Sequence, residues 1–163
     1  MLGVFLRAAL PEGLTMGAFV DQKLAGIALT TAFTFTPPPE IEGTSLNFPP
    51  IGAFIEALER DYERENTGRL DTCAYIHMLA IEDTARGRGI AQTLVSATTQ
   101  NAHSKGFDAV LSDATNPTSQ KVFAKQGFET RYKIRYDKFT HSGIPTFASI
   151  ANLGTIKLVE KHL

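Results

Sequence analysis

A chain of 163 residues, 43% hydrophobic and 20% charged, is long enough to form one globular domain with its own core. The net charge of -1 gives no basic surface for nucleic acid, and the apolar runs end well before the roughly 18 residues that a membrane helix needs. The single cysteine, Cys73, cannot form an internal disulfide, and no Cys/His grouping has the spacing of a zinc site. We therefore expect a cytoplasmic protein of one domain, residues 1–163, with no bound metal and neither nucleic acid nor membrane as a partner.

The first part of the chain predicts a hairpin, a connection and a helix. Residues 14–20 and 24–35 are rich in strand-forming side chains, and the polar break between them favours a turn. Pro37 ends the second strand, because proline has no N–H group for a sheet ladder. Apolar side chains at helical spacing then predict an amphipathic helix over residues 51–68. The opposite face of this helix carries acidic residues, which we interpret as a solvated surface: Glu56, Glu59, Asp61, Glu63 and Glu65.

The rest of the chain alternates strands and helices. The predicted strands are residues 72–81, 107–111, 128–139 and 155–159, and the predicted helices are 90–105 and 117–127. Gly106 suits the end of the first of these helices, while Asn116 and Pro117 are typical of the N-cap and first position of the second. From residue 14 the order is therefore β β α β α β α β β, which indicates an α/β (α+β) domain.

A glycine-rich turn separates the strand at 72–81 from the helix at 90–105: Arg86-Gly87-Arg88-Gly89-Ile90-Ala91. Small residues let the backbone approach a ligand, and the first N–H groups of a helix lack partners within the helix, so the turn predicts a phosphate site. A mononucleotide P-loop needs a lysine and a hydroxyl that are missing here. A dinucleotide motif needs a third glycine, where this chain has Gln92.

This turn and a second block of sequence resemble the GNAT superfamily of N-acetyltransferases. The family signature [Q/R]-x-x-G-x-[G/A] is matched by Arg86-x-x-Gly89-x-Ala91, and a helix that starts with Asn and ends in Gly-Phe is matched by residues 116–128. Residues 78–81 are similar to the family's strand before the turn. The resemblance covers roughly residues 14–139 and implies a central mixed, mostly antiparallel sheet that is splayed at the acetyl-CoA site and flanked by helices.

The resemblance also implies where acetyl-CoA binds as cosubstrate. The backbone of residues 86–91 is expected to hold the diphosphate, and that of residues 79–81 to pair with the pantetheine arm. An N–H group near Leu79 is expected to stabilise the thioester oxyanion. The expected cofactor-binding residues are Leu79, Ala80, Ile81, Arg86, Gly87, Arg88, Gly89, Ile90, Ala91, Asn116 and Phe123.

Two side chains are candidates for catalytic proton transfer. His77 is the candidate base, because it precedes Leu79 by two residues and vertebrate arylalkylamine N-acetyltransferases look similar here. Strand alternation predicts that Tyr75, His77 and Leu79 share one face. Ser119 is the candidate acid, since Phe123 stands where many members carry a tyrosine and insect arylalkylamine acyltransferases are thought to use helix serines. A satisfied core histidine and an ordinary surface serine are the alternatives.

The chain also departs from the family pattern. Only residues 1–13 precede the first predicted strand, where the family has a strand and two helices, so we expect a domain shortened at its N-terminus. The bare edge of that first strand favours a homodimer. The connection at residues 37–70 resembles the insertion of insect and nematode arylalkylamine acyltransferases, which favours a small-molecule amine as the acceptor.

The first hypothesis is an acetyl-CoA-dependent N-acetyltransferase in which a primary amine attacks the thioester directly. The alternative is a CoA-binding module without turnover, or a half-domain that is active only after pairing. A nicotinamide-binding domain would need an acid closing its second strand, for which only Asp113 is available. We interpret Cys73 as a small buried hydrophobe, and His103 and His141 as exposed.

Overall fold

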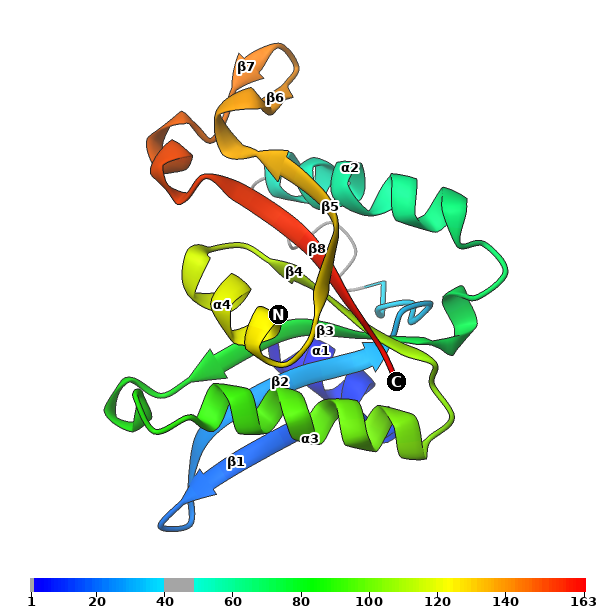
Figure 1. Cartoon of the computed structure of the whole chain (residues 1–163), viewed down its shortest axis with the longest axis vertical. Coiled ribbons are helices and arrows are strands. Elements are labelled where there is room, and N and C mark those ends of the chain that lie inside the picture. The colour runs from blue at the N-terminus through cyan, green and yellow to red at the C-terminus, as the bar shows by residue number, and fades with distance from the viewer. Residues whose placement is uncertain (1, 40–48) are drawn as a thin grey trace.

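The structure, a computed structural model, describes residues 2–39 and 49–163 (Figure 1). Its helices are α1 (Leu2–Ala9), α2 (Pro49–Glu65), α3 (Ile90–Ser104) and α4 (Pro117–Lys125). Its strands are β1 (Met16–Val20), β2 (Lys23–Ala32), β3 (Cys73–Ile81), β4 (Ala109–Ala114), β5 (Glu129–Arg135), β6 (Thr140–His141), β7 (Ile144–Pro145) and β8 (Thr155–His162). The predicted order of elements is confirmed, with the short β6–β7 hairpin added before the last strand. Residues 40–48 of the predicted connection lie outside the described residues.

Six strands form one sheet in the order β1-β2-β3-β4-β8-β5. All neighbouring strands are antiparallel except β3 and β4, which are parallel. That parallel pairing runs only from Cys73↔Ala109 to Ile76↔Ser112, whereas β3 continues to Ile81 beside β2 alone. The two strands therefore diverge beyond Ile76, and Figure 1 shows α4 beside this opening. This confirms the expected mixed, mostly antiparallel sheet with a splay.

Each face of the sheet has its own core. One cluster joins Ile76 and Val110 to Leu94 and Val95 of α3 and to Phe123 of α4, while the other packs α2 on the opposite face. No helix in the described part of the chain is both long and apolar enough to cross a bilayer.

Gly26 on β2 lets α3 approach the sheet closely. A Cβ atom at this position would lie 2.8 Å from Ile81 Cδ1 and 3.1 Å from Leu94 Cδ1. Only a residue without a side chain fits there unless the core shifts. Gly26 therefore helps to hold the first turns of α3 against the end of β3.

Local signals placed the helix ends accurately, whereas strand ends depended on pairing. Gly106 follows α3 with a φ of 85°, as expected of a helix-ending glycine. In contrast, β4 and β8 both extend beyond their predicted ends, because they pair with each other from Ala109↔His162 to Ala114↔Lys157. The predicted strand at 128–139 is shorter, since a 3-10 turn begins at Tyr136.

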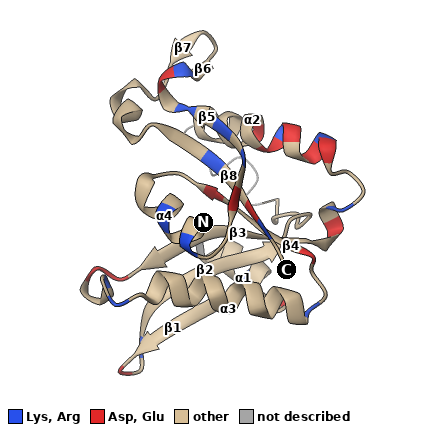
Figure 2. Cartoon of the chain, in the orientation of Figure 1, with Lys and Arg blue, Asp and Glu red and all other residues tan. Residues whose placement is uncertain are grey.

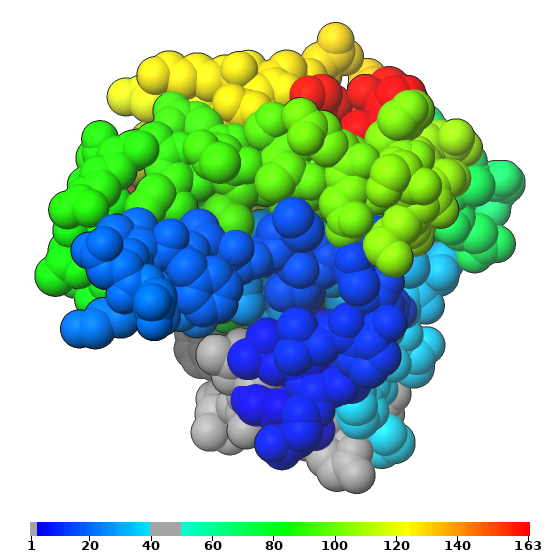
Figure 3. Space-filling view, turned by 90° about the horizontal axis from the view of Figure 1, so that it is seen from below, coloured from blue at the N-terminus to red at the C-terminus, as the bar shows by residue number. Residues whose placement is uncertain are grey.

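β1 lies at one edge of the sheet, which agrees with the prediction that the first strand has an unpaired edge. Figure 3 shows the β1–β2 hairpin, in blue, on the outer surface beside α3, in green. Phe19 on this strand is 68% exposed. The homodimer that this edge favours stays a prediction.

Candidate active site

A β-bulge in β3 decides which side chains surround the opening between β3 and β4. The pairing of β2 with β3 passes from Thr30↔Ile76 to Leu29↔Met78, so His77 has no partner on β2. One extra residue reverses the alternation of every side chain that follows it. Leu79 accordingly packs in the α3 cluster, whereas Tyr75 packs in the α2 cluster. The prediction that Tyr75, His77 and Leu79 share a face is therefore wrong for Leu79.

His77 lies on the Tyr75 side among aromatic rings. Its ring centroid is 4.7 Å from that of Tyr75 and 5.0 Å from that of Phe5 on α1. Its Nε2 atom lies 2.7 Å from Thr31 Oγ1. His77 is an exposed residue at the bulge, but the protein around its ring lowers the pKa of the imidazole to about 4 by desolvation. The ring is therefore neutral at pH 7, with one nitrogen already in a hydrogen bond.

The glycine-rich turn leads from β3 into α3. Gly87 and Gly89 have φ values of 78° and 77°, a left-handed conformation in which other residues are strained. Among the described residues, the backbone N–H groups of Ile90, Ala91 and Gln92 have no hydrogen-bond partner, as at any uncapped helix start. These donors, together with the helix dipole, form a region suited to an anion. This arrangement suits the predicted phosphate site, which stays a prediction.

The arginines and strand residues predicted with this turn lie around it. Arg86 is exposed and pairs with Asp83 at 2.7 Å, and Arg88 is exposed as well. Ala80 and Ile81 belong to the part of β3 that β4 does not pair with, as does Leu79. The backbone edge that β3 turns toward the opening is therefore available to a ligand.

The N-terminus of α4 is held by a capping box. Asn116 Oδ1 accepts hydrogen bonds from the backbone N–H groups of Thr118 and Ser119, each at 3.0 Å. The Ser119 hydroxyl donates to Asn116 O at 2.9 Å and accepts from the Asn116 N–H group at 3.3 Å. The side chains of Asn116 and Ser119 both stabilise the start of α4. The sequence predicted this role for Asn116 and not for Ser119. A catalytic role for Ser119 stays a prediction and requires release of this cap.

Phe123 is 2% exposed and packs in the core, with its ring centroid 5.0 Å from that of Phe128. This side chain therefore packs α4 against the core, and its predicted contact with the cofactor stays a prediction.

A cluster of acids that the sequence did not predict lies on the α2 side of the opening. The Tyr75 hydroxyl donates to Asp113 Oδ2 at 2.8 Å, and Glu59 of α2 lies close enough to both groups for its charge to interact with theirs. Burial, followed by the charge of Asp113, raises the pKa of Glu59 to about 8. Burial raises the pKa of Asp113 to about 7 against the lowering effect of the Tyr75 hydrogen bond.

The prediction of a solvated acidic face on α2 holds for Glu56, Glu63 and Glu65, which are exposed, and is wrong for Glu59. Figure 2 shows the acidic residues of α2 along its outer side. Glu59 follows Ile55 by one helical turn and so borders the apolar stripe. That spacing was the signal available in the sequence.

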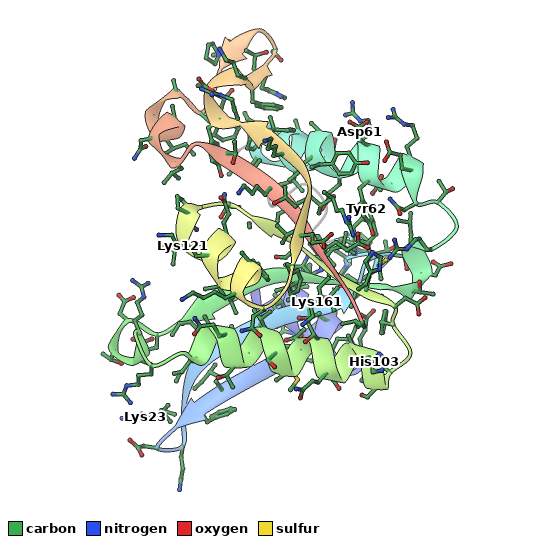
Figure 4. The ribbon with its side chains drawn as sticks, in the orientation of Figure 1. Lys23, Asp61, Tyr62, His103, Lys121 and Lys161 are labelled. Atoms are coloured by element: carbon green, nitrogen blue, oxygen red, sulfur yellow. The ribbon has the colours of Figure 1, made fainter. Side chains whose placement is uncertain are left out.

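A second buried acid, Glu160, lies at the other end of the α2 face. It is 2% exposed, and it accepts hydrogen bonds from Arg69 and Arg131 at 2.7 Å and from the Tyr62 hydroxyl at 2.9 Å. Figure 4 shows Tyr62 on α2, with Asp61 next to it. Burial by itself would raise the pKa of Glu160, but its hydrogen bonds from Arg131 and Tyr62 and the charge of Arg69 hold it below its usual range. A surface pocket of about 510 Å³ opens beside this network.

The remaining candidates have ordinary surroundings. Cys73 is buried, as expected, and burial raises the pKa of its thiol. His103 is exposed near the end of α3, which confirms the expectation, whereas His141 on β6 is half-buried.

Comparisons with known proteins agree with this architecture. Residues 4–128 match the model of the acetyltransferase (GNAT) family. Arylalkylamine N-acetyltransferase 2 from Aedes aegypti is 23% identical with a TM-score of 0.71, over 96% of this chain and 76% of that one.

Two further solved structures show the same fold. A Drosophila melanogaster polyamine N-acetyltransferase, which catalyses the formation of N-acetylagmatine, is 19% identical with a TM-score of 0.77, over 98% of this chain and 79% of that one. The C-terminal condensation domain of Ebony, solved with beta-alanyl-dopamine, is 13% identical with a TM-score of 0.86, over 99% of this chain and 78% of that one.

Proposed function

The chain belongs to the acetyltransferase (GNAT) family, and from this premise we propose that it transfers an acetyl group from acetyl-CoA to a primary amine of a small molecule. The observation that carries the proposal is the opening between β3 and β4, which ends beside the unpartnered N–H groups at the start of α3. Acetyl-CoA is an extended thioester with a diphosphate at its far end. The opening suits the extended arm, and the N–H groups at the start of α3 suit the diphosphate. The family match removes the support for a nicotinamide-binding domain.

The residues of the turn fit a diphosphate. Space is free around Gly87, where a Cβ atom would have no neighbour within 4 Å, and Gly89 brings the chain into α3 with its first N–H groups outward. Arg88 adds positive charge at the same turn, whereas the charge of Arg86 is offset by its ion pair with Asp83. Residues 79–81 offer their unpaired backbone edge to an extended ligand arm.

Aromatic rings gather on the Tyr75 side of the opening, where we expect the acceptor to bind. Phe5, Tyr75 and His77 are in ring contact there, and the ring of Phe35 lies 5.7 Å from that of Phe5. Such walls suit a small organic amine better than a peptide chain that needs backbone partners. The similarity to structures of arylalkylamine and polyamine N-acetyltransferases supports the same acceptor class.

The chemistry that this chain has to supply is removal of a proton from the amine, because an ammonium group is not a nucleophile. The bound thioester supplies the activated acetyl group. His77 is neutral at pH 7 and adjoins the opening, so it stays the predicted base, although its lowered pKa makes it a weak one. The hydroxyl of Ser119 stays the predicted acid.

Release of free thiol from acetyl-CoA tests the proposal. We expect release with at least one member of a panel of arylalkylamines, polyamines, amino acids and aminoglycosides, and acetyl-CoA binding by calorimetry without any amine. Binding without thiol release for the whole panel would favour a CoA-binding module. Absence of both would contradict the proposal. The cytoplasmic location and the homodimer stay predictions.

A further inference from the structure

Asp113 occupies a defined position at the opening between β3 and β4. It follows Ser112, whose pairing with Ile76 is the last one between the two strands. Its Oδ2 atom accepts the hydrogen bond from Tyr75, whereas its Oδ1 atom is buried and has no hydrogen-bond partner among the described residues. A buried carboxylate oxygen without a partner is costly, since it has lost its water and gained nothing in return. A ligand that donates a hydrogen bond at this position would remove that cost.

The surroundings of Asp113 add negative charge and no positive charge. The charge of Asp113 raises the pKa of Glu59, and the charges of Glu63 and Glu56 act on Glu59 in the same direction. Within residues 2–39 and 49–163, neither Glu59 nor Asp113 forms an ion pair with a lysine or arginine. Two neighbouring half-buried carboxyl groups without a counter-ion favour a bound proton or a bound cation.

The other groups around the pair are aromatic. The Tyr75 hydroxyl donates to Asp113, its hydrogen bonding also lowers the pKa of Glu59, and the ring of His77 contacts the Tyr75 ring. Tyr136 is near enough to Asp113 for the acid to raise the pKa of its phenol, after the larger effect of burial. Aromatic faces attract cations and offer them no competing positive charge.

We propose that Asp113 and Glu59, aligned by Tyr75, bind the acceptor amine as its ammonium cation at the mouth of the β3–β4 opening. The identification of this cation as the acceptor depends on the function proposed above, whereas cation binding itself does not. Asp113 Oδ1 accepts a hydrogen bond from the ammonium group, Glu59 adds a second negative charge, and Tyr75 is a positioning residue. The acceptors selected are amines that are protonated at neutral pH, and uncharged isosteres are rejected.

The pKa values of the pair are consistent with such a role. With the pKa of Asp113 near 7 and that of Glu59 near 8, the empty pair holds between one and two protons at pH 7, and a bound cation displaces protons from it. Affinity for a permanently charged guest should therefore rise as the pH increases from 6 to 9. His77, with a pKa of about 4, does not change charge across this range.

Ligand-observed NMR with n-butylamine and n-butanol measures this binding without catalysis. An alkylammonium group titrates near pH 10.4, so the amine stays charged from pH 6 to 9. At pH 9 we expect wild-type protein to bind n-butylamine at least tenfold more tightly than n-butanol. Asp113→Asn and Glu59→Gln should each weaken amine binding about tenfold and leave n-butanol unaffected. Glu63→Gln, an exposed change of the same charge on the same helix, should bind like wild type.

The outcomes separate the two proposals. Equal affinity of wild type and Glu59→Gln for n-butylamine, together with no change in wild-type affinity between pH 6 and 9, would overturn the cation site even if Asp113→Asn failed to fold. Amine binding that depends on Asp113, without thiol release from acetyl-CoA for any amine, would support the cation site and contradict the proposed transfer. Thiol release that is equal in wild type and Asp113→Asn at low amine concentration would support the proposed transfer and contradict the cation site. If both proposals hold, Asp113→Asn should raise the KM for the amine and leave the Kd of acetyl-CoA unchanged.

Discussion

The two ends of the α2 face of the sheet each contain carboxyl groups withdrawn from solvent, fully for Glu160 and partly for Glu59 and Asp113, and their surroundings are opposite. At the closed end, where β3 and β4 are paired, Glu160 has two arginines and Tyr62 as partners, and its pKa is lowered. At the open end, Glu59 and Asp113 have only Tyr75 between them, and their pKa values are raised. A carboxylate with its own cations stabilises the fold, whereas a pair without any is prepared for a cation from outside.

The strongest test of this contrast is Glu160→Gln. We expect a loss of about 3 kcal/mol in the free energy of unfolding, because Arg69 and Arg131 lose the carboxylate between them. Both arginines keep about a third of their side-chain surface exposed, which holds the loss at the lower end of the range for buried ion pairs. Urea denaturation measures it. Glu129→Gln, which removes an exposed partner of the same Arg131, should change stability by less than about 0.5 kcal/mol.

The next test concerns the turn at the open end. Gly89→Ala should weaken acetyl-CoA binding about a hundredfold, since a side chain there would keep the diphosphate from two charge-assisted hydrogen bonds worth about 1.5 kcal/mol each. Calorimetry measures the Kd. Gly106→Ala is the matched control, because Gly106 also has a positive φ and free space around its Cβ position, but ends α3 instead of starting it. Equal losses in both variants would mean that backbone strain, and not ligand contact, is responsible.

His77→Gln tests whether the imidazole contributes to catalysis. We expect kcat to fall about tenfold, less than for a base whose pKa lies near the working pH. The loss should be the same at pH 6 and pH 9, because burial keeps the pKa of His77 near 4 and the ring neutral throughout. Initial rates at saturating acetyl-CoA measure it, with the exposed His103→Gln as control. A loss that is confined to one side of pH 6.5 would contradict the lowered pKa.

The smallest expected effect is on the pH dependence of stability. The folded protein holds a proton on Glu59 up to about pH 8, whereas the unfolded chain releases it near 4.5, so stability should fall as the pH rises between these values. Glu59→Gln should therefore be more stable than wild type at pH 8, by an amount on the order of 1 kcal/mol, and nearly equal to it at pH 4.5. Denaturation at both pH values, with Glu63→Gln as control, gives the difference. A Glu59→Gln protein that is less stable at pH 8 would show that Glu59 is ionised and paired in the fold.

The sequence by itself predicted the features that depend on a few neighbouring residues. The left-handed glycines of the turn, the Asn116 cap and the Gly106 helix end all involve hydrogen bonds or φ values within one turn of chain. The order of strands and helices followed from apolar periodicity, because each element buries one face. The family resemblance followed from the same turn and cap.

Only the tertiary structure decided how distant residues meet. The extra residue at His77 exists only relative to β2, and it moves Leu79 to the other core. In the sequence, Glu59 looks like any other acid on the outer face of a helix. Only the packing of α2 on the sheet brings it near Asp113, which belongs to a strand far along the chain. Partner choice of this kind has no local signature, because a carboxyl group has the same chemistry in both clusters and differs only in which side chains folding places around it.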